Sequence, residues 1–256
     1  MSLNNIELFR QKVLLHQVCF GCVISLTDPV VSEIAAEAGY DFTWIDMEHA
    51  PLTTPATLHH IMALRGTQTF PLVRVPWNDQ VILKQVRDLE PAGIIIPMIR
   101  TAEEAASAVA ACKYPPKGIR GIGPKRGTRY GAVSFSQYAK EADENCMVIL
   151  QIEHIDAAQC TDAILDIPGI DSICIGPSDL SASMGKIGQE NDPEVVAVVD
   201  GLAKKVTERG IILGTASGDV EGWVKRGVNW IATGSDCGNM AAHGRQALGK
   251  AREISQ

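Results

Sequence analysis

Four side chains that can do chemistry each follow a short apolar segment of the sequence. His49 follows DFTWIDME, Arg74 ends FPLVR, Glu153 follows MVILQI, and Asp179 lies in GPSDLS. Two carboxylates brought together repel one another unless a cation lies between them, and hard oxygen ligands suit Mg²⁺ or Mn²⁺. An imidazole can accept and return a proton near neutral pH, and a guanidinium at such a place stabilises an anion. The pattern predicts a divalent-metal site with an acid–base group.

Each of these residues also has an ordinary structural interpretation. Asp179 could cap a following turn, and Arg74 could form a salt bridge with a neighbouring carboxylate. A carboxylate pair could also do general acid–base work, as in glycoside hydrolysis, although only 5% of the residues are aromatic and could stack on a sugar. The carboxylates that could orient the ring of His49 are Asp46, Glu48 and Asp88.

Short β-branched segments alternate along the chain with longer helical patterns, which predicts a parallel sheet with helical crossovers. The expected strands are 18–24, 41–46, 70–74, 93–98, 147–152, 171–175, 211–215 and 229–233. The expected helices are 29–38, 55–65, 78–89, 101–112, 155–165, 193–209, 217–226 and 239–253. Strict alternation favours a closed (β/α)8 barrel (TIM barrel) over a doubly wound open sheet. Reactive groups in such barrels lie at the C-terminal ends of the strands, where these four residues fall.

Length and composition limit the classes of protein. The 256 residues match the roughly 250 of one barrel, so a single domain over 1–256 is expected. A net charge of −7 argues against nucleic acid as the main partner. No apolar run long enough for a transmembrane helix and no signal-peptide pattern are found, which favours a cytoplasmic protein. Seven scattered cysteines argue against a disulfide framework, and Cys19 and Cys22 are expected on opposite faces of a strand rather than in a redox or zinc site.

The motifs DMEHAPLT, FPLVRVPWND, IIIPMI, YPPKGIRGIG, QIE and GPSDLSASMG occur together and in this order. With them the chain resembles the HpcH/HpaI aldolase family over about residues 5–250. The resemblance implies a barrel of the phosphoenolpyruvate/pyruvate-domain type. It also implies a metal-dependent class II pyruvate aldolase, which reversibly cleaves a 4-hydroxy-2-oxo acid to pyruvate and an aldehyde. The implied cofactor is one divalent ion, Mg²⁺, Mn²⁺ or Co²⁺, and the implied assembly is a homohexamer built as a trimer of dimers.

The resemblance also assigns roles to particular residues. Glu153 and Asp179 fall on the metal-binding carboxylates, His49 on the catalytic histidine, and Arg74 on the arginine that stabilises the enolate. Asp88 falls on the carboxylate that raises the basicity of the histidine and is supplied across a subunit interface. The residues expected to contact substrate are Arg74, Gln151, Gly176, Pro177, Ser178 and Asp179. The chain departs from the family pattern at Met47, Ser178, 90–92 and the loop GPKRGTRYG, which concerns the aldehyde more than the metal.

Three rival functions remain open at this stage. A Schiff-base aldolase needs a buried lysine at a strand end, and no expected strand ends in lysine. Another metal-enolate lyase on the same scaffold, such as a citryl-CoA-type lyase or an oxaloacetate decarboxylase, could use the basic loop 113–130 to hold a phosphate or CoA tail. A non-catalytic protein that binds pyruvate or another oxo acid is the third alternative.

Overall fold

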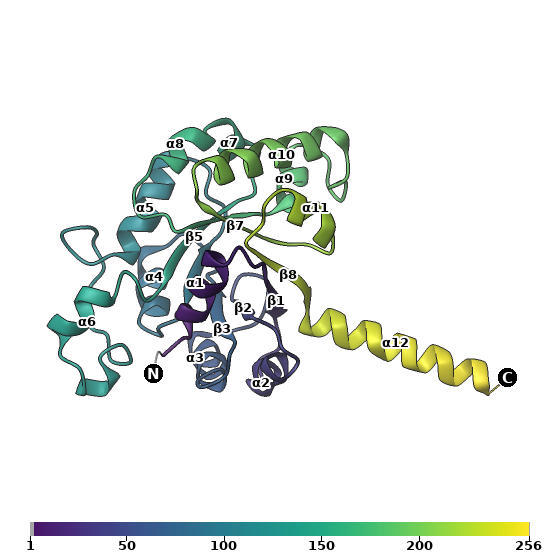
Figure 1. The fold of residues 1–256 in the computed structure, drawn as a ribbon, viewed down its shortest axis with the longest axis horizontal. Helices are drawn as coiled ribbons and strands as arrows, with labels where there is room; N and C mark the ends of the chain where they lie inside the picture. Colours follow the sequence, from purple (N-terminus) through teal and green to yellow (C-terminus); the bar gives the residue numbers. More distant parts are fainter. Residues whose placement is uncertain (1–2, 256) are drawn as a thin grey trace.

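The structure, a computed structural model, describes residues 3–255, so the expected domain 1–256 extends at both ends beyond the described residues. Its strands form one closed parallel barrel in sequential order, with β8 pairing with β1. They are β1 (Cys19–Ile24), β2 (Phe42–Asp46), β3 (Phe70–Arg74), β4 (Gly93–Ile96), β5 (Met147–Ile152), β6 (Ser172–Ile175), β7 (Ile212–Ala216) and β8 (Trp230–Ser235). The expected (β/α)8 barrel is confirmed, and the doubly wound sheet is excluded (Figure 1).

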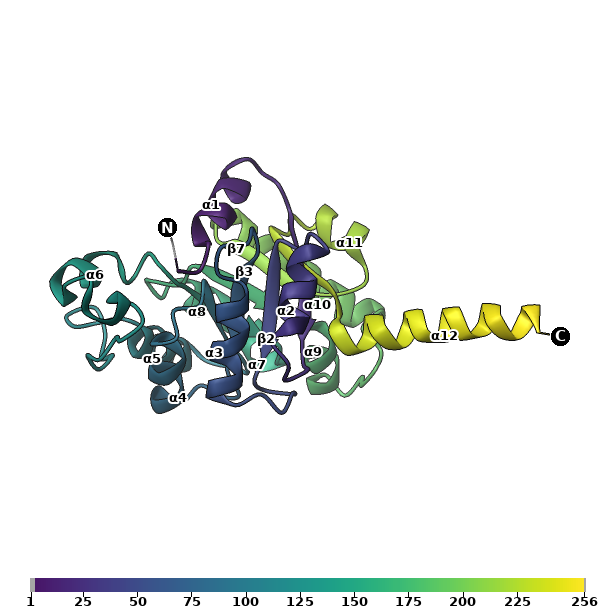
Figure 2. The same ribbon diagram turned by 90° about the horizontal axis from the view of Figure 1, so that it is seen from below.

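Helices surround the barrel on its outside (Figure 2). They are α2 (Val30–Glu37), α3 (Thr54–Ala63), α4 (Gln80–Arg87), α5 (Ala102–Cys112), α7 (Ile155–Gln159), α8 (Thr161–Leu165), α10 (Pro193–Glu208) and α11 (Val220–Lys225). The helix expected over 155–165 is two helices, because the backbone leaves helical geometry at Cys160 (φ −111°, ψ 20°). Three helices were not expected, α1 (Ile6–Leu14), α6 (Phe135–Glu141) and α9 (Pro177–Ser183). No helix within residues 3–255 is both long and apolar enough to cross a membrane.

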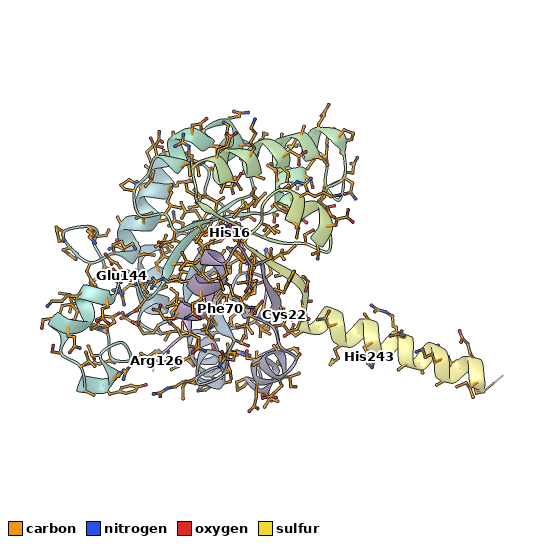
Figure 3. The ribbon with its side chains drawn as sticks, viewed as in Figure 1. His16, Cys22, Phe70, Arg126, Glu144 and His243 are labelled. Carbon is orange, nitrogen blue, oxygen red and sulfur yellow. The ribbon has the colours of Figure 1, made fainter. Side chains whose placement is uncertain are left out.

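Apolar side chains pack in two layers, one inside the barrel and one between the barrel and its helices. Successive strand residues point to opposite faces, so Cys19 joins the inner layer and Cys22 the outer layer, as expected. Helix α1 adds Ile6 and Phe9 to the inner layer, where the ring of Phe9 lies 5.2 Å from that of Phe70. Figure 3 shows Phe70 within the body of the barrel. Helix α1 therefore plugs the end of the barrel at which β3 begins.

The last helix, α12 (Asp236–Ile254), leaves the barrel and projects away from it (Figures 1 and 2). The helix expected over 239–253 therefore exists, but it does not pack in the ring of helices, and none of its described side chains is buried. Figure 3 shows the side chains along it, including that of His243, standing apart from the barrel. At 3.6 residues per turn one face carries small or apolar residues throughout. These are Cys237, Met240, Ala241, Gly244, Ala247, Leu248, Ala251 and Ile254.

Candidate active site

A cavity of about 130 Å³ opens where the strands end. All six residues expected to contact substrate line it, and the other lining residues are Val23, Trp44, Ile175 and Ala216. This clustering follows from the fold, because the C-terminal ends of parallel strands meet at one rim of the barrel. None of the side chains lining this cavity is a lysine. A Schiff-base mechanism therefore lacks its nucleophile here.

Glu153 lies directly after β5 and is 2% exposed. Its Oε1 accepts a hydrogen bond from the backbone N–H of Met98 at 2.8 Å, and its Oε2 accepts one from the side-chain amide of Gln151. Strand β4 ends at Ile96 rather than at the expected residue 98, and Met98 has a positive φ of 56°. Burial raises the pKa of Glu153 to about 7. The charges of Glu48 and Asp179 raise it too, whereas the Met98 hydrogen bond and Arg74 lower it.

Gly176 supplies the space that Glu153 occupies. A Cβ at this position would lie 2.7 Å from Oε2 of Glu153, 2.9 Å from its Cβ and 3.1 Å from Nε2 of Gln151. These contacts are too short, and two of them involve the buried carboxylate and its partner. The φ of Gly176 is −104°, so glycine is required by this close approach and not by backbone conformation.

Arg74 lies between two carboxylates. Its Nε and Nη2 donate to Asp46 at 2.9 and 2.7 Å, its Nη1 lies 3.0 Å from Oε2 of Glu48, and its guanidinium stacks 5.0 Å from the ring centre of Trp44. The salt-bridge interpretation of Arg74 is therefore realised, and Arg74 also lines the cavity. A guanidinium has five N–H donors, so these contacts leave donors for a ligand anion.

His49 and Asp179 both interact electrostatically with Glu48. The His49 side chain is 65% exposed, and its Nε2 lies 3.7 Å from Oε2 of Glu48. Gly176 is the N-cap of helix α9, so Asp179 lies within the first turn of this helix. Asp179 is therefore not the capping residue that the sequence allowed. The amides at the start of a helix have no acceptor within it, so those of Ser178 and Asp179 are available to an anion.

The rim carries more negative than positive charge. Glu153, Asp179, Glu48 and Asp46 interact electrostatically around one guanidinium, that of Arg74. The Oε1 of Gln151 is buried and has no hydrogen-bond partner within the described structure. Excess carboxylate charge and a spare oxygen suit a hard divalent cation, so these residues fit one. Among residues 3–255 no three His, Cys, Asp or Glu side chains form a complete ligand cage. A cation held by two carboxylates, those of Glu153 and Asp179, would leave positions for substrate oxygens.

Asp88 does not reach His49 within one chain. It ends α4, and its carboxylate accepts a hydrogen bond from Nη2 of Arg120 at 2.7 Å. Helices of the barrel run antiparallel to the strands, so the end of α4 lies at the opposite rim from Glu153. The loop 113–130 lies at that rim too, because it follows α5 and precedes β5. Neither can line the cavity of its own chain.

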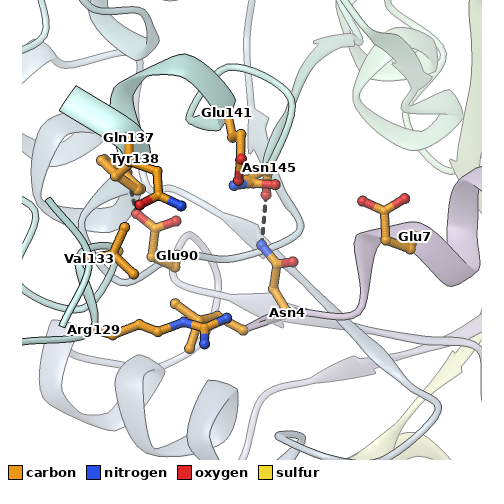
Figure 4. A pocket seen from close by; sticks show the side chains of 11 residues that line it. Asn4, Glu7, Glu90, Arg129, Val133, Gln137, Tyr138, Glu141 and Asn145 are labelled. Atoms are coloured by element: carbon orange, nitrogen blue, oxygen red, sulfur yellow. Dashed lines mark hydrogen bonds between the residues drawn. The ribbon is translucent and has the colours of Figure 1, made fainter. Parts of the chain in front are cut away.

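A larger cavity, about 420 Å³, lies at this opposite rim beside α6 (Figure 4). Its wall includes Glu90, which is 2% exposed and accepts a hydrogen bond from the Tyr138 hydroxyl at 2.5 Å. Asn4 ties the N-terminal segment to this region by donating to the carbonyls of Pro91 and Asn145. None of the residues expected in the active site lines this cavity. This end of a (β/α)8 barrel contributes to stability more than to chemistry.

Trp44 and Met98 were missed by the sequence analysis. The inward alternation Phe42, Trp44 and Asp46 along β2 could have placed Trp44 beneath the rim. Met98 gave no signal, because its contribution is a backbone N–H aimed by a positive φ that apolar residues rarely adopt.

Known proteins resemble this chain over most of its length. A family model described as HpcH/HpaI aldolase/citrate lyase matches residues 20–242. The 5-keto-4-deoxy-D-glucarate aldolase of Klebsiella pneumoniae is 35% identical over 234 residues, 90% of this chain and 91% of that protein. The hydroxypyruvate/pyruvate aldolase of Roseobacter denitrificans is 33% identical and covers 94% of this chain and 96% of its own. An HpcH/HpaI aldolase from Desulfitobacterium hafniense has a crystal structure with a TM-score of 0.88 at 28% identity, covering 95% of this chain and 96% of that one. These matches confirm the resemblance that the motifs indicated.

Proposed function

The chain belongs to the HpcH/HpaI aldolase/citrate lyase family, and we propose that it is a carbon–carbon lyase that reversibly cleaves a 4-hydroxy-2-oxo acid to pyruvate and an aldehyde. We propose further that it works with one divalent ion held by Glu153 and Asp179. The observation that carries the proposal is the buried carboxylate of Glu153, which interacts electrostatically with Asp179 and Arg74, two residues that line the cavity.

The divalent ion, when bound, would supply a Lewis acid for the oxygens of the 2-oxo acid. The chain's own residues do the rest. Arg74 holds positive charge beside the C2 oxygen, where negative charge develops as the carbon–carbon bond breaks. Backbone amides of Ser178 and Asp179 receive the substrate carboxylate. His49 accepts the C4 hydroxyl proton during cleavage and returns it during condensation.

The rigidity of the rim supports this assignment. Arg74 is fixed by two directed hydrogen bonds to Asp46 and by Trp44, so it need not reorganise when charge appears. Gly176 lets the backbone of the substrate-contacting turn lie against Glu153 and Gln151. The carboxylate group of the substrate and the metal ligands would therefore share one wall of the cavity.

Pyruvate release from 4-hydroxy-2-oxo acids tests the proposal. The assay couples pyruvate to lactate dehydrogenase, with the protein stripped by EDTA and then supplied with Mg²⁺, Mn²⁺ or Co²⁺. We expect metal to restore cleavage in the parent chain and in Glu208→Gln, a control at an exposed surface carboxylate, but not in Glu153→Gln. Cleavage that survives complete metal removal would overturn the metal-dependent mechanism.

Three further measurements separate the rivals. Inactivation by borohydride in the presence of pyruvate would identify a Schiff-base enzyme in place of the proposed one. Metal and pyruvate binding without turnover of a broad set of aldehydes would favour a binding protein. Release of pyruvate from oxaloacetate, or of oxaloacetate and an acetyl thioester from a citryl thioester, without cleavage of any hydroxy-oxo acid, would assign another metal-enolate lyase of the family.

We also propose that the chain works as a homo-oligomer, as the family resemblance implied. The apolar face of α12 has no cover within its own chain, and the outside of the barrel exposes apolar side chains on β1, α2 and α11. These side chains are Phe20 on β1, Val30 and Ile34 on α2, and Val224 on α11. Helix α12 of a second copy would cover both surfaces. In such an assembly Asp88 and the loop 113–130 could approach a neighbour's cavity, which they cannot do in their own chain.

A further inference from the structure

Glu48 lies between His49, which accepts the proton in the proposed reaction, and Arg74, which faces the developing negative charge. It follows Asp46, the last residue of β2, in a turn that Asp46 holds by accepting the backbone N–H groups of Glu48 and His49 at 3.0 and 3.4 Å. The turn is therefore fixed by the same carboxylate that fixes Arg74. Glu48 and His49 project from a backbone whose position is set by the barrel.

The side chain of Glu48 is 13% exposed, and its Oε2 contacts a group on each side. Arg74 Nη1 lies 3.0 Å from Oε2, and His49 Nε2 lies 3.7 Å from the same atom. Oε2 is buried and accepts no well-directed hydrogen bond within the described structure. It can therefore accept one from an imidazole N–H after a small movement of the exposed His49 ring.

The positive charges around Glu48 only partly balance its negative charge. Asp46 takes the two directed hydrogen bonds of Arg74, and Glu48 shares the remaining charge of the same guanidinium. The charged or titratable groups facing Glu48 are Arg74 on β3, Asp46 on β2, His49 on its own turn, Asp179 on α9 and Glu153 after β5. Burial raises the pKa of Glu48, and Arg74 and His49 lower it. A second cation beside Glu48 would stabilise its charge.

We propose that Glu48 is the positioning residue of His49: it turns Nε2 toward the cavity side of Arg74 and stabilises the ring once it has taken the proton. This inference rests on the proposed function, because it takes His49 as the base. Within one chain, it chooses Glu48 over the other two carboxylates considered for the histidine. Asp46 is occupied by Arg74 and the turn, and Asp88 of the same chain lies at the other rim.

A direct test follows the imidazole signals of His49 by NMR during a pH titration of the full-length protein, without metal or substrate. The chain has six histidines, and His49→Gln identifies the signal. Removing the negative charge makes the imidazolium lose its proton at lower pH. We expect Glu48→Gln to move the titration midpoint down by about half a unit or more, because an opposite charge at this distance favours the protonated form. Glu48→Asp, which keeps the charge, should restore part of the difference.

The control is Glu33→Gln, which removes the same charge from an exposed position on α2. An unchanged midpoint in Glu48→Gln, in a variant that folds as the parent does, would overturn the inference. The titration needs no turnover. If the parent chain shows no aldolase activity while the midpoint still moves, the proposed function fails and the pairing of Glu48 with His49 stands.

Kinetics provide the second readout. In Glu48→Gln we expect kcat to fall about tenfold and the rising limb of the kcat/KM profile to move to lower pH, with the KM for the 2-oxo acid little changed. In a His49→Ala background the same substitution should cost less than about twofold, because the two residues act as one unit. A full additional loss in that background would show that Glu48 acts through Arg74 instead, and would also overturn the inference.

Discussion

The buried carboxylate of Glu153 should cost the metal-free protein stability at neutral pH, and Glu153→Gln should recover it. The pKa of this group rises from an ordinary 4.5 to about 7 because burial penalises its charged form. Between these two values the unfolded chain has released the proton while the folded chain still holds it. Stability therefore falls as the pH rises through this window and levels off above it. A difference of about 2.5 pKa units corresponds to roughly 3 kcal/mol.

Glutamine preserves the shape and the local hydrogen bonds. Its carbonyl can accept the N–H of Met98, and its amide can donate to the Oε1 of Gln151, which has no partner now, if the Gln151 amide turns over. We expect metal-free Glu153→Gln to match the parent chain below about pH 4.5 and to exceed it by up to about 3 kcal/mol above about pH 7. Adding Mn²⁺ should stabilise the parent and leave the variant unchanged, because ligand binding to the folded state adds its binding free energy.

Urea unfolding in EDTA across this pH range, at one protein concentration, measures the effect. Glu208→Gln, at an exposed carboxylate on α10, controls for loss of one charge. A stability difference between Glu153→Gln and the parent that is independent of pH would contradict a buried, destabilising charge on Glu153. So would a variant that is the less stable protein at about pH 8 without metal.

Gly176→Ala should lower metal affinity at least tenfold and reduce the free energy of unfolding by about 1–3 kcal/mol, because the new Cβ would collide with Glu153. Gly201→Ala in α10, where a Cβ has no close neighbour, should be neutral or stabilising. Calorimetric Mn²⁺ titration measures the affinity, and urea unfolding measures the stability. Arg74→Lys should lower kcat about a hundredfold while secondary structure persists, because lysine cannot make the two-pronged contact with Asp46; near-parental kcat would contradict this. A double variant, Met240→Glu with Leu248→Glu, should dissociate the assembly at micromolar concentration in analytical ultracentrifugation, whereas Lys250→Glu on the polar face should not.

The barrel itself was readable from the sequence because each strand is a short β-branched run and each crossover has helical periodicity. Two strands, β3 and β5, begin and end where the pattern indicates. Helix α1 was missed because its apolar residues, Ile6 and Phe9, pack into the end of the barrel rather than onto its side. The break at Cys160 was missed because periodicity continues through it. Sequence periodicity reports which face of an element is apolar, and it does not report what that face contacts.

The same limit applies to α12. Its amphipathic pattern is that of a helix covering a barrel, and nothing in the pattern distinguishes its own barrel from a neighbour's. The structure holds the first turn by Asp236, whose carboxylate accepts the backbone N–H groups of Ser25 and Leu26 at 2.8 and 2.9 Å, while the rest of the helix continues into solvent. The helix therefore has a fixed direction, which a flexible tail would lack. A fixed direction lets one copy present its apolar face to another at low entropic cost.

The candidate site shows a further distinction between what a sequence and a fold determine. Strand ends predicted that Arg74, Gln151 and Asp179 meet at one rim, and they line one cavity. Strand ends could not predict that Arg74 would be shared by Asp46 and Glu48, because that depends on side-chain direction after a strand has ended. The sharing matters chemically. A guanidinium already matched by two carboxylates attracts a substrate anion less strongly than a lone one, so the rim needs another positive charge to bind a 2-oxo acid. The metal ion proposed for Glu153 and Asp179 would supply this charge, and metal loading and substrate binding would then be one coupled equilibrium.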